Sequence, residues 1–148
     1  SFLHAGSEFL RSKKGVENSF ESPDSVNAID WNLKTKNKYV FEYVKALIKM
    51  RKEHPAFRMM SAKQIASNIK FLEGMPAGVI AYPINGAAVG DKWKKIFVAF
   101  NGTGKDVSLP AQSGNYKCFI AGNMISETIG GYEGYWRLAP FSCNIMYQ

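Results

Sequence analysis

Most of the residues that could carry out chemistry lie in one stretch, residues 6–31. Its polar members are Glu8, Arg11, Lys13, Lys14, Glu17, Asn18, Asp24, Asn27 and Asp30. Ser22, Pro23 and Asp24 are typical of a helix start with Ser as N-cap, which places Asp24 and Asn27 three residues apart on one face of a short turn. A carboxylate and an amide arranged in this way could hydrogen-bond neighbouring hydroxyl groups of a sugar. The alternative is that Asp24 caps the turn and Asn27 holds the loop together.

Arg11 and Phe20 are the other two candidate binding residues of this loop. Arg11 could reach a ligand, although an internal salt bridge to Glu8 or Asp24 is the favoured interpretation. Phe20 could stack on a sugar ring, although packing under the loop is favoured. Long irregular loops in compact domains are usually functional or disordered, and aromatic residues argue against disorder. Asn18 and Trp31 are interpreted as structural, and His4 as a core residue.

The elements flanking this loop are typical of an α/β barrel. Residues 2–5 predict a short strand that opens into the polar loop, as at the active-site end of such a barrel. Residues 37–53 predict a long amphipathic helix, because apolar side chains recur there at a spacing of three to four. Pro55 and the residue before it, His54, mark the end of this helix. Residues 61–64 match a capping box that opens one further helical turn.

The remainder of the chain predicts an antiparallel β-sandwich, because short β-rich runs alternate with Gly, Pro and Asn. Residues 96–100 are expected to form the central strand, and residues 86–91 a flexible hairpin loop. The expected strands are 69–72, 78–84, 95–101, 105–109, 115–120, 133–138 and 141–147. Trp93, Tyr132, Tyr135 and Trp136 could form a sugar platform, but core and interface packing is favoured. A turn is expected at Gly130 and Gly131.

Several motifs together resemble one known family. FLRSKKG (residues 9–15), ENSF (17–20), SPDSVN (22–27) and IDW (29–31) resemble the end of the catalytic barrel of type I pullulanases. These are starch-debranching members of the α-amylase superfamily, in glycoside hydrolase family 13. RKEHPAFR (51–58) is similar to the last barrel helix and its exit, while VAFN (98–101) and VSLP (107–110) are similar to patterns of the C-terminal sandwich, domain C. The resemblance implies that residues 1–62 end a (β/α)8 catalytic barrel and that residues 63–148 form the sandwich.

The same resemblance implies that this chain has no catalytic residue. The catalytic Asp, Glu and Asp of the family lie on barrel strands four, five and seven, whereas residues 2–5 resemble strand eight. Retaining glycosidases need two carboxyl groups about 5–5.5 Å apart. The carboxylates of this loop do not indicate such a pair, and Glu8 and Asp24 are the best local candidates. The expected role is therefore substrate binding through Asp24, Asn27, Arg11 and Phe20, in an enzyme that cleaves α-1,6 linkages of pullulan, glycogen or starch by a retaining mechanism.

Composition narrows the remaining possibilities. The chain has 148 residues and a formal charge of +7 that is spread out, whereas nucleic-acid binding favours a clustered basic face. Cys118 and Cys143 have no neighbouring His, so buried thiols are expected rather than a zinc site. No apolar run is long enough for a membrane span, and no signal peptide is found. The chain opens in mid-element without an initiator Met, as a fragment would, so its compartment cannot be inferred.

Two alternatives to a pullulanase fragment stay open. One is an isoamylase-like or branching enzyme of the same superfamily; the other is a stand-alone carbohydrate-binding or interaction module built on the sandwich. The expected partner is an α-glucan, no metal or cofactor site is expected in this chain, and calcium binding by the parent is left open. An exposed apolar helix face, with Val40, Val44, Leu47 and Ile48, could also drive self-association.

Overall fold

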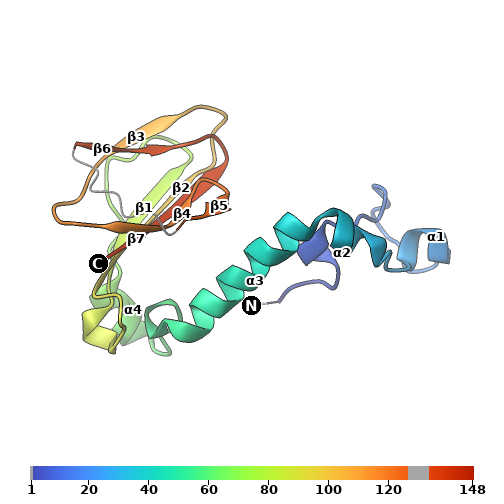
Figure 1. Cartoon of the computed structure of the whole chain (residues 1–148), viewed down its shortest axis with the longest axis horizontal. Helices are drawn as coiled ribbons and strands as arrows, with labels where there is room; N and C mark the ends of the chain where they lie inside the picture. The colour runs from blue at the N-terminus through green and yellow to red at the C-terminus, as the bar shows by residue number, and fades with distance from the viewer. Residues whose placement is uncertain (1, 127–133) are drawn as a thin grey trace. The chain divides into compact units, whose positions relative to one another are not determined.

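A computed structural model describes residues 2–126 and 134–148 (Figure 1). The chain divides into two compact units, Ser1–Lys49 and Met50–Gln148. Residues 50–61 therefore pack with the second unit, whereas the predicted domain boundary lies near residue 62. That boundary concerns the domains of a larger protein and stays a prediction.

The first unit contains short helices joined by irregular chain. Its elements are η1 (Ser7–Phe9), α1 (Asp24–Asn27), α2 (Asn32–Lys36) and the first turns of α3 (Lys38–Glu53). The prediction of a strand at residues 2–5 is wrong for this chain, because a strand is defined by its hydrogen-bonded neighbour and the described residues of this unit offer none. The predicted helix start is also shifted: Pro23 occupies the N-cap position of α1, without a side-chain cap.

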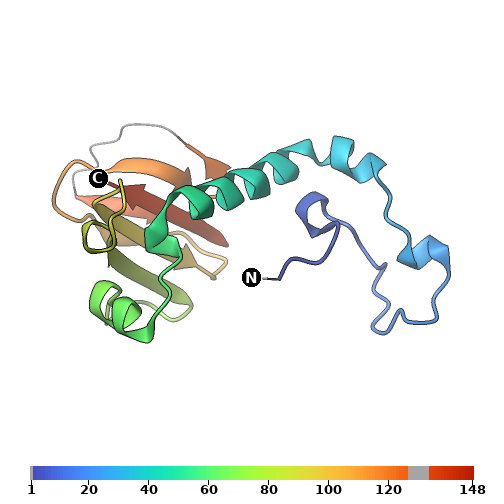
Figure 2. The ribbon, with the colours of Figure 1, turned by 90° about the horizontal axis from the view of Figure 1, so that it is seen from below.

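Helix α3 confirms the long helix expected over residues 37–53, and it runs without interruption (Figure 2). Arg51 and Lys52 lie in its last turn, where cations interact favourably with the helix dipole. His54 follows in an extended conformation, as expected for a residue that precedes proline. The apolar face is only partly covered: Val40, Val44 and Leu47 are half-buried, and Ile48 is 47% exposed.

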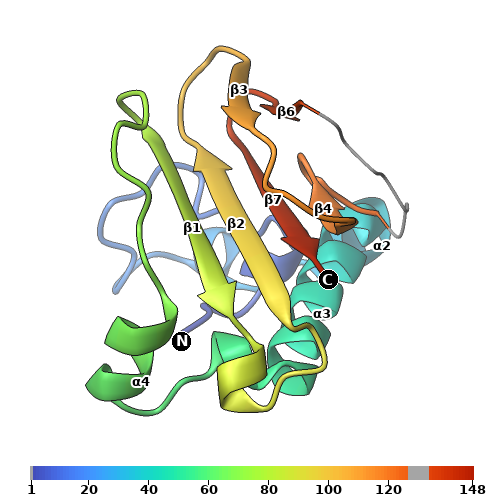
Figure 3. The same ribbon diagram turned by 90° about the vertical axis from the view of Figure 1, so that its left-hand side faces the viewer.

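The second unit is an antiparallel sandwich, as predicted. Its strands are β1 (Val79–Asn85), β2 (Lys95–Asn101), β3 (Val107–Pro110), β4 (Lys117–Ala121), β5 (Met124–Ile125), β6 (Tyr135–Leu138) and β7 (Ser142–Tyr147). One sheet has the order β1-β2-β7-β4-β5, and β3 pairs with β6 in a second sheet. Figure 3 shows the first sheet face-on, and Figure 1 shows β3 and β6 as a separate layer. The predicted central strand, β2, is an interior strand beside β7, which occupies the middle.

Two details of the strand prediction need correction. Residues 69–72 form no strand: α4 (Ala62–Asn68) precedes them, and only an isolated bridge joins Ile69 to Ile84. Strand β5 was missed because it has only two residues, too few to show an alternation of apolar and polar side chains. The predicted cap of α4 is confirmed, since Ser61 Oγ accepts a hydrogen bond from the Gln64 amide at 3.2 Å.

The core of the sandwich lies between the two sheets. Phe97 and Ala99 of β2 face Trp136 and Leu138 of β6, and the Trp136 ring meets Phe97 edge-on at 4.7 Å. Ile96 and Val98 point to the opposite face of the sheet and are equally buried. Since β2 is covered on both faces, its sequence is a continuous apolar run without alternation.

Asn101 explains why the pattern at residues 98–101 ends in asparagine. Its buried amide nitrogen donates to the carbonyl oxygens of Lys105, Leu138 and Ala139, and its Oδ1 accepts from Thr103. One side chain therefore ties the end of β2 to the turn at residues 102–105 and to the end of β6. A buried hub of this kind rigidifies a fold when every polar atom is satisfied.

A buried hydrogen bond between His54 and Asp91 attaches the chain segment after α3 to the sandwich. His54 Nδ1 lies 2.7 Å from Asp91 Oδ1, and the side chains are 2% and 0% exposed. The other carboxylate oxygen accepts from the Ala56 amide at 3.0 Å, and the His54 ring stacks on Trp93 at 3.6 Å. The sequence-based interpretation of His54 as a helix-end residue was therefore incomplete. The loop at residues 86–91, expected to be flexible, is fixed by Asp91.

The ionisation of Asp91 is set by these contacts. Burial opposes the charged form, but hydrogen bonds from the Ala56 amide, the His54 ring and the Trp93 amide outweigh it and lower the pKa of Asp91. Gly86 is required beside this pair, because a Cβ at that position would lie 2.0 Å from the Trp93 carbonyl oxygen. The pair thus depends on the local path of the loop as well as on its own charges.

Both cysteines are free thiols, as predicted. Cys118 is buried and Cys143 half-buried. Burial raises the pKa of Cys118 to about 11 and, with a contribution from Cys118, that of Cys143 to about 12. Thiols with such values are poor nucleophiles, so they serve packing.

Candidate functional site

The loop at residues 6–31 belongs entirely to the first unit and is organised around Asn27. The Asn27 amide nitrogen donates to the carbonyl oxygens of Ser19 and Ser22, at 2.8 and 2.7 Å, and its Oδ1 accepts from Lys13 Nζ at 2.5 Å. Both amide hydrogens and the oxygen are used within the loop. Asn27 therefore holds three segments of the loop together. This is the structural alternative to sugar binding that the sequence left open for Asn27.

Arg11 supports the same turn from the other side. Its guanidinium donates to the carbonyl oxygens of Asn27 and of Ala5, and it forms no ion pair with Glu8 or Asp24, so the predicted salt bridge is wrong. The reason is local: Arg11 N binds the Gly6 oxygen at 2.8 Å, and Gly6 has a φ of 92°. This turn, which favours glycine, directs the side chain of Arg11 toward the backbone at Asn27.

A pocket of about 340 Å³ opens beside this turn. It is lined by Arg11, Lys14, Asp24 and Asp30, together with apolar side chains that include Leu33. Asp24 lies at the start of α1, and its exposed carboxylate has no hydrogen bond or ion pair among the described residues. The structure thus brings Arg11 and Asp24 together, with Asp24 as the acceptor left available to a ligand.

Phe20 lies outside the lining of this pocket. Its side chain is 87% exposed, so the prediction that it packs under the loop is wrong. Asn18 Oδ1 accepts from the Phe20 amide at 3.2 Å, which fixes the backbone turn while leaving the ring in solvent. An exposed aromatic ring held by an ordered turn can stack on an apolar sugar face.

The neighbouring residues of the loop have structural contacts or none. Trp31 lies against the buried Phe9, with ring centroids 5.8 Å apart, although its own side chain is 65% exposed. This contact agrees with a structural role. Glu8 accepts a hydrogen bond from the Gly6 amide at 3.0 Å, so its carboxylate stabilises the turn. His4 is exposed rather than a core residue, because no strand packs around it.

The aromatic run of the sandwich serves mainly for packing, as favoured from the sequence. Trp136 is 4% exposed in the core, and Trp93 stacks on Tyr147 at 4.1 Å as well as on His54. Only Tyr135, 68% exposed, could contact a ligand directly. Tyr132 and the expected turn at Gly130 and Gly131 lie outside the described residues.

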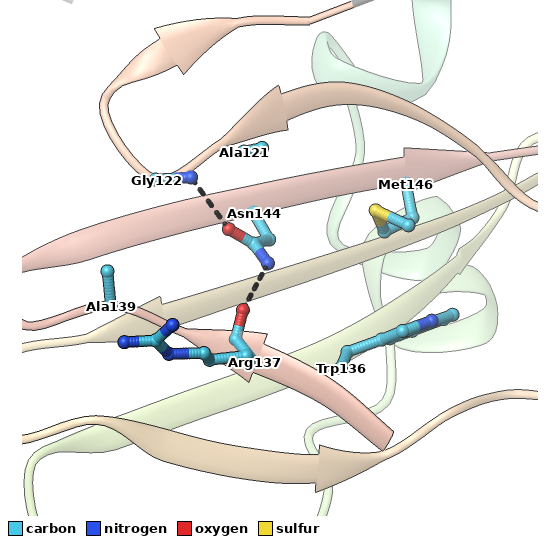
Figure 4. A pocket seen from close by; sticks show the side chains of 7 residues that line it. All are labelled: Ala121, Gly122, Trp136, Arg137, Ala139, Asn144 and Met146. Carbon is cyan, nitrogen blue, oxygen red and sulfur yellow. Dashed lines mark hydrogen bonds between the residues drawn. The ribbon is translucent and has the colours of Figure 1, made fainter. Parts of the chain in front are cut away.

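A second pocket, of about 350 Å³, lies beside Trp136 and Met146 in the sandwich (Figure 4). Asn144 crosses it: its Oδ1 accepts from the Gly122 amide at 2.9 Å, and its nitrogen donates to the Arg137 carbonyl at 3.1 Å. The Arg137 side chain binds both carboxylate oxygens of Asp106. These polar groups already have partners within the protein. Asn144 therefore links neighbouring strands across the pocket, and the pocket offers few free polar groups to a ligand.

The roles of three residues that organise the loop could not be recognised from the sequence. Lys13 was named among the polar residues of the loop without a partner, and Ser22 was expected to be an N-cap. Ser19 and Ser22 act through their backbone oxygens, which the residue type does not reveal. Residues 2–126 and 134–148 hold no cluster of three or more His, Cys, Asp or Glu side chains suited to a metal. Within the same residues, no helix is long and apolar enough to cross a membrane.

The chain has relatives among known proteins. A family model described as pullulanase, all-beta domain, matches residues 65–124. The pullulanase of Bacillus subtilis (strain 168) is 42% identical over 97 residues, which is 66% of this chain and 13% of the relative. The isoamylase of Pseudomonas amyloderamosa is 29% identical over 122 residues, 74% of this chain and 16% of the relative.

Solved structures extend the similarity to nearly the whole chain. The crystal structure of pullulanase complexed with maltotetraose from Anoxybacillus sp. LM18-11 matches 99% of this chain with a TM-score of 0.86 and 35% sequence identity. The match spans 21% of that protein. The chain therefore corresponds to about a fifth, or less, of the length of these relatives.

Proposed function

This chain is related to the pullulanases, and from that premise we propose that it is the C-terminal part of a debranching glycoside hydrolase. The parent enzyme would cleave α-1,6-glucosidic linkages in pullulan, glycogen or starch. The observation that supports this most is the match of 99% of the chain to a pullulanase whose structure holds maltotetraose. Residues 1–62 would then end the catalytic barrel, and residues 63–148 would form its C-terminal sandwich.

The mechanism assigned to the parent is retaining hydrolysis. Such enzymes place a nucleophilic carboxylate and an acid/base carboxyl group about 5–5.5 Å apart. In this chain Glu8 accepts a hydrogen bond from the Gly6 amide, and although Asp30 lines the same pocket as Asp24, no hydrogen bond joins Asp24 to another side chain among the described residues. We therefore assign catalysis to residues that precede the chain, and substrate binding to the loop.

Within the loop, the proposed contacts to the α-glucan come from two exposed groups. The free carboxylate of Asp24 accepts hydrogen bonds from sugar hydroxyls, and the exposed ring of Phe20 stacks on a sugar face. Arg11 borders the pocket of Asp24 and contributes through its guanidinium. Asn27 acts indirectly, because its amide is used to hold the loop in shape.

The test is a chimera in which this chain replaces the matching segment of the Bacillus subtilis pullulanase. We expect it to hydrolyse pullulan, and we expect Asp24→Asn to lower kcat/KM about tenfold, equivalent to one charge-assisted hydrogen bond of about 1.5 kcal/mol. Phe20→Ala should raise KM by a similar factor. Lys34→Gln, a change outside the pocket, is the control. Unchanged kinetics in both loop variants would contradict the proposed contacts.

An isoamylase-like parent is the second candidate, supported by the similarity to the isoamylase. Substrate choice separates the two. We expect the chimera to prefer pullulan over amylopectin; a preference for amylopectin that depends on residues of this chain would favour the isoamylase reading. A stand-alone module on the sandwich is less favoured, because Trp136, its best aromatic candidate, is buried in the core.

A further inference from the structure

A groove of about 740 Å³ lies on the second unit between α4 and the ends of β1 and β2. Its walls are residues 66–70, residues 83–85, the start of β2 and residues 112–116 of the β3–β4 connection. We call it the α4–β1 groove. Its volume lies in the range of sites that hold small molecules, about 300–1,000 Å³.

The polar side chains that line the α4–β1 groove are largely unused. Lys70, Lys95, Gln112 and Ser113 have no side-chain hydrogen bond or ion pair among the described residues. Asn85 Oδ1 accepts from the Ala88 amide at 3.3 Å, which leaves its amide hydrogens available. The pocket of Figure 4 differs in this respect, because its Asn144 and Arg137 already have partners.

Tyr116 also lines the groove. The residue is 7% exposed, and its ring packs edge-on against Trp136 at 5.2 Å. Its ring therefore belongs to the core of the sandwich and gives this side of the groove a fixed wall.

The charge of the groove indicates what kind of ligand it suits. Lys70 and Lys95 line it, and no Asp or Glu does. Lysine ammonium groups are point charges that bind phosphate well, while amide and hydroxyl side chains bind sugar hydroxyls. We propose that the α4–β1 groove binds a phosphate-bearing α-glucan chain, with Lys70 and Lys95 at the phosphate and Asn85, Gln112 and Ser113 at the hydroxyls; the glucan part of this inference rests on the proposed function.

The groove would then select phosphorylated regions of a glucan independently of the loop at residues 6–31. Binding of the phosphate should weaken with salt, because exposed charges are screened over about 8 Å at physiological ionic strength. Hydrogen bonds to sugar hydroxyls have no such dependence. The two contributions can therefore be separated in one titration.

The experiment is calorimetric titration of the whole chain with three probes: maltoheptaose, maltoheptaose carrying one 6-phosphate, and inorganic phosphate. We expect the phosphorylated glucan to bind at least about tenfold more tightly than either of the other probes at low salt. Lys70→Gln with Lys95→Gln should remove that advantage. The matched control, Lys63→Gln with Lys105→Gln, changes two exposed lysines outside the groove and should alter affinity by less than about twofold.

Three results would overturn the proposal: equal binding of plain and phosphorylated glucan, an advantage that survives loss of both groove lysines, or inorganic phosphate binding as tightly as the phosphorylated glucan. The last result would identify a free anion as the ligand. Asp24→Asn with Phe20→Ala separates this site from the proposed function, because it should leave the phosphate advantage unchanged. If the chimera were inactive on pullulan but the chain still bound the phosphorylated glucan more tightly than the plain glucan, the proposed function would be contradicted and the groove proposal would stand.

Discussion

Asn27 shows how a single side chain can define a loop that has almost no secondary structure. Its side-chain amide is hydrogen-bonded to Ser19, Ser22 and Lys13. Its backbone carbonyl oxygen accepts a hydrogen bond from Arg11. Loops expose their backbone unless side chains supply the missing hydrogen bonds. The exposed groups, Asp24 and Phe20, are therefore held in place by residues that need not touch a ligand.

Replacing Asn27 should loosen this loop without unfolding the sandwich. Asn27→Ala removes three hydrogen bonds, each worth about 1 kcal/mol, so amide hydrogen exchange of residues 18–28 should accelerate roughly a hundredfold. Asp24→Asn is the matched control on the same turn and should leave exchange unchanged, because its carboxylate has no internal partner. Equal protection in the wild type and Asn27→Ala would contradict the assigned role.

The His54–Asp91 pair predicts a dependence of stability on pH. The folded pKa of Asp91 is lowered from its ordinary value of 3.8, so its contribution is present above about pH 4 and is lost as the pH falls through the folded pKa. Hydrogen bonds to a charged group are worth about 1.5–3 kcal/mol each, and the Asp91 carboxylate accepts several. Asp91→Asn should therefore lower the urea midpoint strongly at pH 7 and weaken the loss of stability at acid pH.

Asp106→Asn provides the control for this measurement. The pKa of Asp106 is also lowered, mainly by its hydrogen bond to Arg137, but the pair is solvent-exposed, and salt and water screen such pairs. We expect little change in its urea midpoint. If Asp106→Asn and Asp91→Asn had equal effects, the buried pair would not be the anchor of the segment after α3.

At the residue scale, the sequence indicated which residues were candidates but not how they were connected. Asp24 and Arg11 were correctly placed in one region, because both belong to one short polar stretch. The contact of His54 with Asp91 could not be predicted, because the residues are 37 positions apart and neither spacing nor residue type reports a long-range pair. Phe20 was misjudged because a large apolar side chain is usually buried, whereas this one is 87% exposed.

At the scale of elements, periodicity was informative for long segments and poor for short ones. Helix α3 and strand β2 were predicted within a residue, because each has a long apolar pattern. Residues 2–5 have the composition of a strand but no partner, and a strand depends on its neighbour as a helix does not. The β5 strand, with two residues, is too short to carry a period.

Helix α3 presents apolar side chains that the chain only partly covers, including Tyr39 at 73% and Ile48 at 47% exposure. Surfaces of this type promote association. We expect sedimentation velocity to show concentration-dependent self-association of the chain, and Ile48→Glu to reduce it. Lys45→Glu, on an exposed position of the same helix, should have little effect. A strictly monomeric wild type at high concentration would contradict this expectation.

At the scale of the whole molecule, the sandwich was predictable and the division of the chain was not. Regular turns and β-rich runs identified every described strand of the sandwich except β5. The chain divides between Lys49 and Met50, and just after this point His54 contacts Asp91 and Trp93. Tertiary contacts of this kind leave no local pattern in the sequence. Function was suggested by motifs in the loop and not by any catalytic group, in accordance with the proposed assignment of catalysis to preceding residues.

The assignment of catalysis to preceding residues is tested by measuring the reducing ends released from pullulan, by the chain alone and by the chimera with the Bacillus subtilis pullulanase. We expect no release above background from the chain alone and clear hydrolysis by the chimera. Turnover by the isolated chain would contradict it, because catalytic carboxylates would then have to lie within these 148 residues. A folded chimera that binds maltotetraose but leaves pullulan intact would equally contradict the proposed debranching role.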